Sequence, residues 1–294
     1  MVINFEVLTS YSFLVVSLGT LILAVAAGSV GCITVLKGQS LIGDAIGHAS
    51  FPGIILAFML FMQRDPLILL LGALISGSIA FILIQVINKN SKLDLDATLA
   101  IILSSFFGLG MVLKSHIQGN PNYQGASQSG IQNYIFGQAA YIMTKDIKLI
   151  LAVATFSLLI LIIFYKEIKL FVFDENYART IGMNTTVLNG IILFMTMSLI
   201  SAGLKVVGAI LISALLIVPA ITALQWSNKF SVVLFIAGIV GGISAVIGTY
   251  ISTVYNGMST GPTIILIMTI FAFFSLIVGP HGLLANLKMR RKIL

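Results

Sequence analysis

The sequence predicts an all-α, polytopic integral membrane protein, and three observations lead to this fold class. Hydrophobic residues make up 59% of the 294 residues, charged residues make up only 9%, and the mean hydropathy is +1.11. Soluble domains of this size do not have such a balance. The apolar residues also collect in runs long enough to cross about 30 Å of hydrocarbon, where helices satisfy every backbone hydrogen bond. We expect one transmembrane domain over residues 1–294.

Nine apolar runs, taken in chain order, are predicted to span the membrane. They cover residues 12–36, 41–62, 67–88, 97–117, 146–165, 187–203, 206–224, 231–254 and 263–279. Only Leu204 and Lys205 separate the sixth run from the seventh, so eight crossings are an alternative. The first ten residues lack the positive start of a signal peptide, and the run that follows is too long for the core of one. We therefore expect the first run to stay as a spanning helix.

Lysine and arginine residues predict the orientation. With the N-terminus outside, cytoplasmic segments contain eleven of them, and these are Lys37, Lys89, Lys92, Lys166, Lys169, Arg179, Lys229, Lys288, Arg290, Arg291 and Lys292. Outer segments contain five, which are Arg64, Lys114, Lys145, Lys148 and Lys205. The positive-inside rule then predicts an N-out, C-in chain. Because these residues are scattered singly between apolar runs, they do not indicate a nucleic-acid partner.

The candidate metal site lies in the stretch 43–49, within the second run. Asp44 and His48 are four residues apart, which places both on one helical face about 6 Å apart along the axis. A carboxylate in hydrocarbon costs roughly 3 kcal/mol unless it is paired, solvated or metal-bound. The alternative is a structural polar contact between helices, since small residues surround the pair and permit close packing. We interpret the pair as metal ligands, and the short turn 37–39 before them as recessed into the protein.

Two polar connections between the runs differ in character. Residues 118–133 carry no charge and are predicted to form an outer loop, and residues 134–143 are too short to span and are predicted to be re-entrant or interfacial. Together they make an outer segment of about 118–144. The connection 166–185 is predicted to be cytoplasmic and to contain a short helix of about 174–182.

The short helix at 174–182 has recognisable ends. Asp174 is the expected N-cap, and Gly182 suits the position that follows a helix C-terminus. Between these ends the helix carries both charged and apolar residues: Glu175, Tyr177, Ala178 and Arg179. Such an amphipathic helix lies on lipid headgroups or docks onto a partner, and the residues themselves leave both possibilities open.

The sequence contains no catalytic motif that we can identify. It has no HExxH zinc motif, no GxSxG nucleophile elbow and no GxxxxGK[ST] phosphate loop. The chain is therefore not expected to be an enzyme or to hydrolyse ATP by itself. Its single cysteine, Cys32, provides neither a disulfide framework nor a CxxC metal site. His116 and His281 lie near helix ends, where a structural role is expected for them.

Three blocks of the chain resemble the metal-ion permeases of ATP-binding-cassette importers, which take up manganese, zinc or iron with a separate binding protein. The blocks cover residues 35–53, 173–182 and 207–220, and they occur in the order found in that family. The resemblance extends over essentially the whole chain. The outer block 134–140 is most similar to the manganese branch. One departure is Gly47, where the family commonly has serine, and this change removes a hydroxyl but neither candidate ligand.

This resemblance implies a homodimeric or pseudo-dimeric permease of the bacterial plasma membrane, with its pathway along the subunit interface. It also implies ATP-binding-cassette ATPase subunits beneath the permease and an extracellular metal-binding lipoprotein above it. The residues expected to couple the permease to the ATPase are Asp174, Glu175, Tyr177, Ala178, Arg179 and Gly182. A two-fold axis would join two Asp44–His48 pairs, and such oxygen and nitrogen ligands suit divalent first-row metals. No permanently bound cofactor is expected, and manganese is the expected cargo.

Other functions compete with this expectation. A zinc or iron importer of the same family would use the same residues. A proton-coupled secondary carrier would use Asp44 and His48 as a proton relay, but the cytoplasmic helix and the lack of other intramembrane acids disfavour it. An intramembrane metalloprotease is disfavoured more strongly, because the sequence lacks a second histidine motif and a general base.

Overall fold

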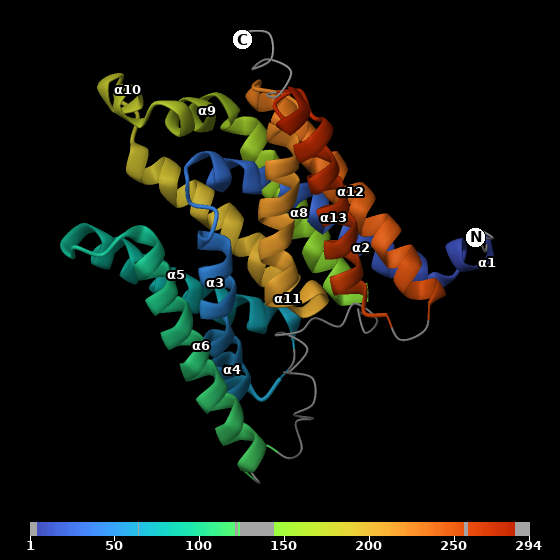
Figure 1. Ribbon diagram of the computed structural model, residues 1–294. Coiled ribbons are helices and arrows are strands. Elements are labelled where there is room, and N and C mark those ends of the chain that lie inside the picture. The colour runs from blue at the N-terminus through green and yellow to red at the C-terminus, as the bar shows by residue number, and fades with distance from the viewer. Residues whose placement is uncertain (1–4, 64, 121–122, 124–143, 256–257, 286–294) are drawn as a thin grey trace.

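The described part of the protein is helical, as the computed structural model in Figure 1 shows. The structure describes residues 5–63, 65–120, 123, 144–255 and 258–285. The helices in these residues are α1 (Phe5–Leu8), α2 (Tyr11–Leu36), α3 (Ile42–Ala49), α4 (Phe51–Phe61), α5 (Pro66–Asn90), α6 (Leu95–Gly119), α8 (Thr144–Ile163), α9 (Tyr165–Phe173), α10 (Glu175–Thr180), α11 (Thr185–Leu224), α12 (Phe230–Val254) and α13 (Thr260–Val278). The all-α prediction is confirmed for this part of the chain. Most of the predicted outer segment, residues 121–122 and 124–143, lies outside it.

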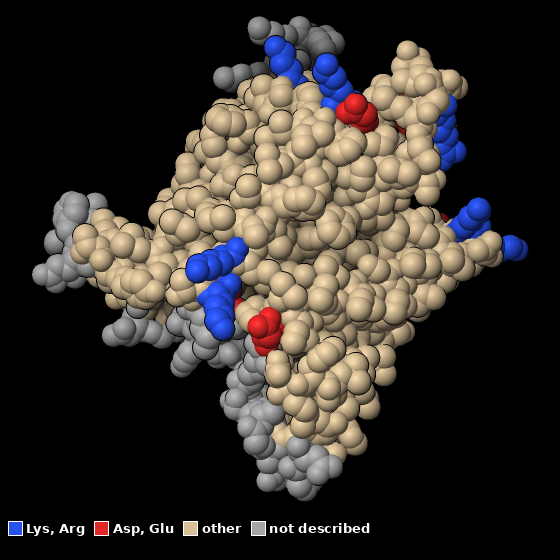
Figure 2. All heavy atoms as spheres, turned by 180° about the vertical axis from the view of Figure 1, so that it is seen from behind, with Lys and Arg blue, Asp and Glu red and all other residues tan. Residues whose placement is uncertain are grey.

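Nine helical segments of the described chain are long and apolar enough to cross a membrane, which confirms the predicted number. They are Phe13–Leu36, Ile42–Phe61, Pro66–Asn90, Leu95–Gln118, Thr144–Ile163, Thr185–Leu204, Val206–Leu224, Phe230–Val254 and Thr260–Ala285. The surface in Figure 2 agrees with a membrane protein, because uncharged residues cover most of that face and charged residues gather in a few groups. The molecule is therefore a multi-pass membrane protein.

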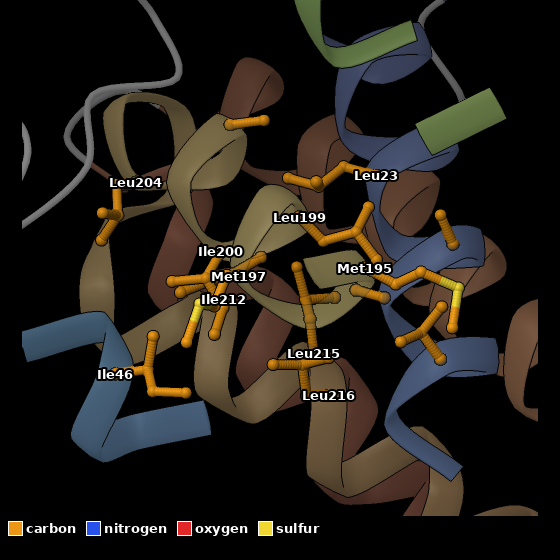
Figure 3. Packing of buried hydrophobic residues seen from close by; sticks show 14 of the residues in the cluster. Leu23, Ile46, Met195, Met197, Leu199, Ile200, Leu204, Ile212, Leu215 and Leu216 are labelled. Carbon is orange, nitrogen blue, oxygen red and sulfur yellow. The ribbon is translucent and has the colours of Figure 1, made fainter. Parts of the chain in front are cut away.

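Helix α11 holds two of these spans because the chain reverses direction at Gly208. This residue has φ 79° and ψ 167°, a backbone conformation that glycine adopts without the steric cost met by other residues. In one straight helix, residues 203 and 212 would lie about 13 Å apart. Instead, a Cβ atom built on Gly203 would lie 2.7 Å from Cδ1 of Ile212. Figure 3 likewise shows Ile200 and Ile212, from the two halves of α11, side by side. The eight-crossing alternative is therefore wrong.

Helix α2 lies at the centre of the packing, between α11 and α12. Glycines allow the backbones to approach closely at these contacts. A side chain on Gly31 of α2 would overlap the backbone carbonyl of Leu216 in α11. In α12, Gly238 and Gly242 both face Val25 of α2, which is the close helix packing expected of a GxxxG pair.

The second predicted run is two helices rather than one. Helix α3 ends at Ala49, and α4 begins at Phe51 with Pro52 in its first turn. Proline has no backbone N–H, so it cannot donate the helical hydrogen bond to the carbonyl of His48. A separate eight-residue helix results, and it packs against α5, α6 and α11. This packing places α3, with both candidate metal ligands, inside the bundle (Figure 1).

Candidate metal site

Asp44 and His48 face one another across one turn of α3, as their spacing predicts. Nε2 of His48 lies 3.6 Å from Oδ1 of Asp44. The side chain of His48 is 17% exposed and that of Asp44 is 37% exposed. The pair is therefore open to a further group on one side, while its flanking residues Ala45 and Gly47 are buried. Carboxylate oxygen and imidazole nitrogen are both ligands for divalent metals.

Ser213 of α11 holds the carboxylate in place. Its Oγ donates a hydrogen bond to Oδ1 of Asp44 at 3.1 Å and lies 3.0 Å from the carbonyl oxygen of Ala209, one turn earlier in α11. This contact joins residues 169 positions apart in the chain. The sequence alone does not signal this contact, because a small residue such as Ser213 is equally suited to plain helix packing.

Phe107 of α6 covers the imidazole on another side. The rings of His48 and Phe107 meet edge to face, with centroids 5.1 Å apart and an interplanar angle of 86°. Both rings line a cavity of only about 10 Å³, which also touches Leu204 and Ala209 of α11. Nδ1 of His48 is buried and has no hydrogen-bond partner in the described part of the protein. A buried polar atom without a partner costs about 1–3 kcal/mol.

One chain supplies only part of a coordination sphere. Among the described residues, no group of three or more His, Cys, Asp or Glu side chains is arranged to hold a metal ion. Asp44 and His48 are thus two candidate ligands, whereas zinc takes about four and magnesium-like ions about six. A bound ion would need further ligands, for example from water or from another copy of the pair.

The predicted short helix is present as α10, and both predicted ends are confirmed. Oδ1 of Asp174 accepts a hydrogen bond from the backbone N–H of Tyr177 at 2.8 Å, as an N-cap does. Gly182 has φ 85° and follows the last turn, where the left-handed conformation favours glycine. Arg179 forms an ion pair of 2.6 Å with Glu175 and donates through Nε to Thr185 at the start of α11. Helix α10 is therefore tied to α11.

The outer surface of α10 is apolar as well as charged. Tyr177 is 54% exposed and the neighbouring Ile181 is 49% exposed, whereas Ala178 is buried. Figure 1 shows α10 projecting at the end of the molecule, next to α9. A small apolar surface flanked by charges is suited to a protein contact.

One other observation bears on the predictions from the sequence. Asp146 in the first turn of α8 is 3% exposed and lies within a candidate span. Asp146 is thus an acid buried in the bundle at the end of a candidate span, a position that the predicted run 146–165 already includes.

We expect Ser213→Ala to weaken metal binding without unfolding the protein. Loss of a group that orients a ligand typically lowers metal affinity by about 10- to 100-fold. The measurement is the half-saturating manganese concentration of the purified protein. Ser198→Ala, which changes another buried serine of α11, is the control. Equal affinities for the two variants would contradict a role for Ser213 at the site.

The fold and the site together define a multi-pass membrane protein with an acid–histidine pair inside the bundle. The chain belongs to the ABC 3 transport family, whose model matches residues 10–279. The manganese transport system membrane protein MntC of Bacillus subtilis is 42% identical over 280 residues, covering 93% of this chain and 63% of that protein. The zinc transport system membrane protein TroC of Treponema pallidum is 37% identical over 286 residues, and this match covers 97% of this chain and 95% of that protein.

One further relative is named for iron transport, and one similar protein has a solved structure. The chelated iron transport system membrane protein YfeD of Yersinia pestis is 34% identical over 257 residues, covering 87% of this chain and 82% of that protein. The solved structure of PsaBC from Streptococcus pneumoniae in complex with Fab matches with a TM-score of 0.84 and 28% identity. That match covers 97% of this chain and 98% of the PsaBC chain. The family resemblance seen in the sequence is confirmed.

Proposed function

We propose that this chain is the membrane permease of an ATP-binding-cassette importer that carries a divalent transition-metal ion, manganese, into the bacterial cytoplasm. The observation that carries this proposal is the Asp44–His48 pair, with 3.6 Å between Nε2 and Oδ1 in a helix enclosed by α5, α6 and α11. Ionisable residues inside a membrane bundle mark ion pathways. The relatives named for manganese, zinc and iron transport support the same conclusion.

The proposed assembly contains a second copy of the permease. One chain offers two ligands, and a two-fold axis would give two carboxylates and two imidazoles. An extracellular metal-binding lipoprotein would deliver the ion, which is cargo rather than a resident cofactor. The chain is proposed to lie in the plasma membrane with its N-terminus outside, since this orientation places eleven of its sixteen basic residues in the cytoplasm.

ATP hydrolysis is assigned to separate ATPase subunits that contact α10. This helix presents exposed Tyr177 and Ile181 beside the Glu175–Arg179 pair. Its link to α11 through Arg179 and Thr185 offers a route for movement into the bundle. A secondary carrier would have no need for such a cytoplasmic docking helix, so the importer is the better-supported function.

Manganese is proposed as the cargo although the site is not expected to bind it most tightly. Sites with nitrogen and oxygen ligands hold zinc more tightly than manganese. A transport site must also release its ion, so binding has to be weak enough for exit. We infer that selection rests on the rate of release and on the ion that the outer protein delivers.

The test is ATP-driven uptake into proteoliposomes that contain the permease, its ATPase and its binding protein. Manganese, zinc and ferrous iron are supplied one at a time at equal free concentrations. We expect manganese to accumulate, and zinc to bind but to move at least about tenfold more slowly. Faster accumulation of zinc or iron would assign the chain to that branch of the family. Uptake driven by a proton gradient without ATP would overturn the importer.

A further inference from the structure

A cavity of about 960 Å³ lies between α5 and the first half of α11, away from the metal site. Its remaining walls come from the α2–α3 turn and from α9 and α10. Figure 2 shows the surface indented on the right, between two groups of basic residues. The volume is in the range of cavities that hold a small molecule or part of a lipid.

The cavity changes from polar to apolar along its length. Its α5 wall runs from Lys89 and Gln85 at one end to Ile82 and Leu74 at the other. Fifteen residues of helix between Lys89 and Leu74 correspond to about 22 Å. The α11 wall changes in the same direction, from Asn189 to the apolar residues deeper in the bundle. The polar end is at the side of the molecule that also carries α10.

The two walls touch within the apolar half of the cavity. Oγ of Ser78 in α5 lies 3.6 Å from Sδ of Met197 in α11, within hydrogen-bond distance for sulfur. Both residues line the cavity, and Leu193 and Phe194 lie about one turn nearer its polar end. The apolar half therefore lies between two candidate membrane spans, α5 and the first half of α11.

The polar end carries an excess of positive charge. Lys37, Lys89 and Arg179 line the cavity together with a single acid, Glu175. Glu175 already forms the 2.6 Å ion pair with Arg179. Among the described residues, no carboxylate lies within ion-pair distance of Lys37 or Lys89, because the two pairs found there are Asp44–His48 and Glu175–Arg179.

Lys37 is the central residue of this end. It lies one residue beyond the α2 span, and its Nζ donates to Oδ1 of Asn189 at 3.2 Å and lies 3.9 Å from the ring centroid of Phe171. Burial lowers the pKa of Lys37, and the charge of Glu175 opposes that effect. A half-buried ammonium group with neutral contacts gains from an added anion.

The cavity is separate from the candidate metal ligands. Asp44 and His48 face Ser213 and Phe107, and neither ligand lines the cavity. Helix α5 meets another face of α3, where Oγ of Ser76 donates to the carbonyl oxygen of Ala49 at 2.6 Å. A net positive lining would also repel a divalent cation.

We propose that this cavity binds an anionic phospholipid, with its phosphate at the basic end and an acyl chain against the apolar half. Basic pockets between membrane helices recognise anionic headgroups, and the apolar half excludes a free phosphate as the complete ligand. This inference takes one thing from the proposed orientation of the chain, namely that the bound lipid belongs to the cytoplasmic leaflet. Lipid binding itself does not depend on transport, so its test is independent of the proposed function.

The experiment compares lipid retention by the purified full chain in detergent, measured by native mass spectrometry. The probes are dioleoyl phosphatidylglycerol and dioleoyl phosphatidylcholine, which share their acyl chains. We expect the anionic lipid to be retained at least about tenfold better. A lysine near an anionic headgroup contributes about fivefold in affinity, so Lys37→Met and Lys89→Gln should each reduce retention by that factor. Lys169→Gln, an exposed lysine of α9 outside the cavity, is the matched control.

Two further arms identify the occupant. A phosphatidylglycerol with a photoreactive group on its acyl chain should crosslink to α5 or to the first half of α11, and dihexanoyl phosphatidylglycerol should be retained poorly. Equal retention of both dioleoyl lipids, or wild-type retention by both cavity variants, would overturn the proposal. Displacement by millimolar inorganic phosphate would also overturn it, as would displacement by the ATPase subunit. If Lys37→Met does not yield folded protein, Lys89→Gln carries the test.

Discussion

Asp44→Asn and His48→Ala are each expected to abolish metal uptake while the protein still folds and inserts. Each change removes a proposed ligand, and the remaining ligand in each chain cannot hold the ion alone. Because loss of a mere orienting group costs 10- to 100-fold in metal affinity, we expect a loss of at least about 100-fold here. Removing a charge from the bundle interior should not destabilise it, since the charged form is the costly one there. ATP-driven uptake at matched expression is the measurement.

The controls for this prediction are an Asp→Asn and a His→Ala substitution at residues outside the candidate metal site. Asp96→Asn at the start of α6 and His116→Ala near its end alter exposed residues outside the site. Both are expected to transport like the wild type. Near wild-type uptake by either site variant would show that the pair is a structural contact rather than a metal site.

Charge reversal on α10 is expected to disconnect the ATPase and leave the metal site intact. The double variant Glu175→Arg, Arg179→Glu keeps an ion pair within the helix but presents the opposite pattern to a partner. Exposed pairs of this kind contribute at most about 0.5 kcal/mol, so α10 should still form. We expect co-purification of the ATPase, or metal-stimulated ATP hydrolysis, to fall by about tenfold or more. Metal binding by the isolated permease should not change.

Two comparisons make this result specific. Tyr177→Ala changes an exposed residue of α10 that does not line the neighbouring cavity. It is expected to have the same effect, which separates docking from any change at the cavity. Lys166→Glu in α9 reverses another exposed charge nearby and should have little effect. An intact, metal-stimulated complex with the double variant would count against α10 as the docking helix.

Local patterns explain how much of this molecule was predictable. The lengths of the apolar runs predicted the spans, because hydrocarbon thickness fixes the length of a helix. The spacing of Asp44 and His48 placed both on one face of α3, and Asp174 and Gly182 predicted the ends of α10. These features depend only on residues within a few turns of one another.

Features that depend on distant residues could not be predicted in this way. Ser213 reaches Asp44 across 169 positions, and Phe107 meets His48 from another helix. The reversal at Gly208 has no polar loop to signal it, since Lys205 is the one charged residue between the two apolar runs. The cavity between α5 and α11 likewise arises from the angle at which two apolar helices meet, which a pattern along one helix does not determine.

The turn at Gly208 has a mechanical consequence. The first half of α11 begins at Thr185, where Arg179 of α10 holds it, and reaches Leu204 beside His48. These twenty residues form a rod of about 30 Å without an internal joint. A movement of the proposed docking helix α10 would therefore be carried along this rod to Leu204 beside His48, and across the reversal to the half of α11 that carries Ser213. Gly208 thus ends a lever that would connect the proposed docking helix with the candidate metal site.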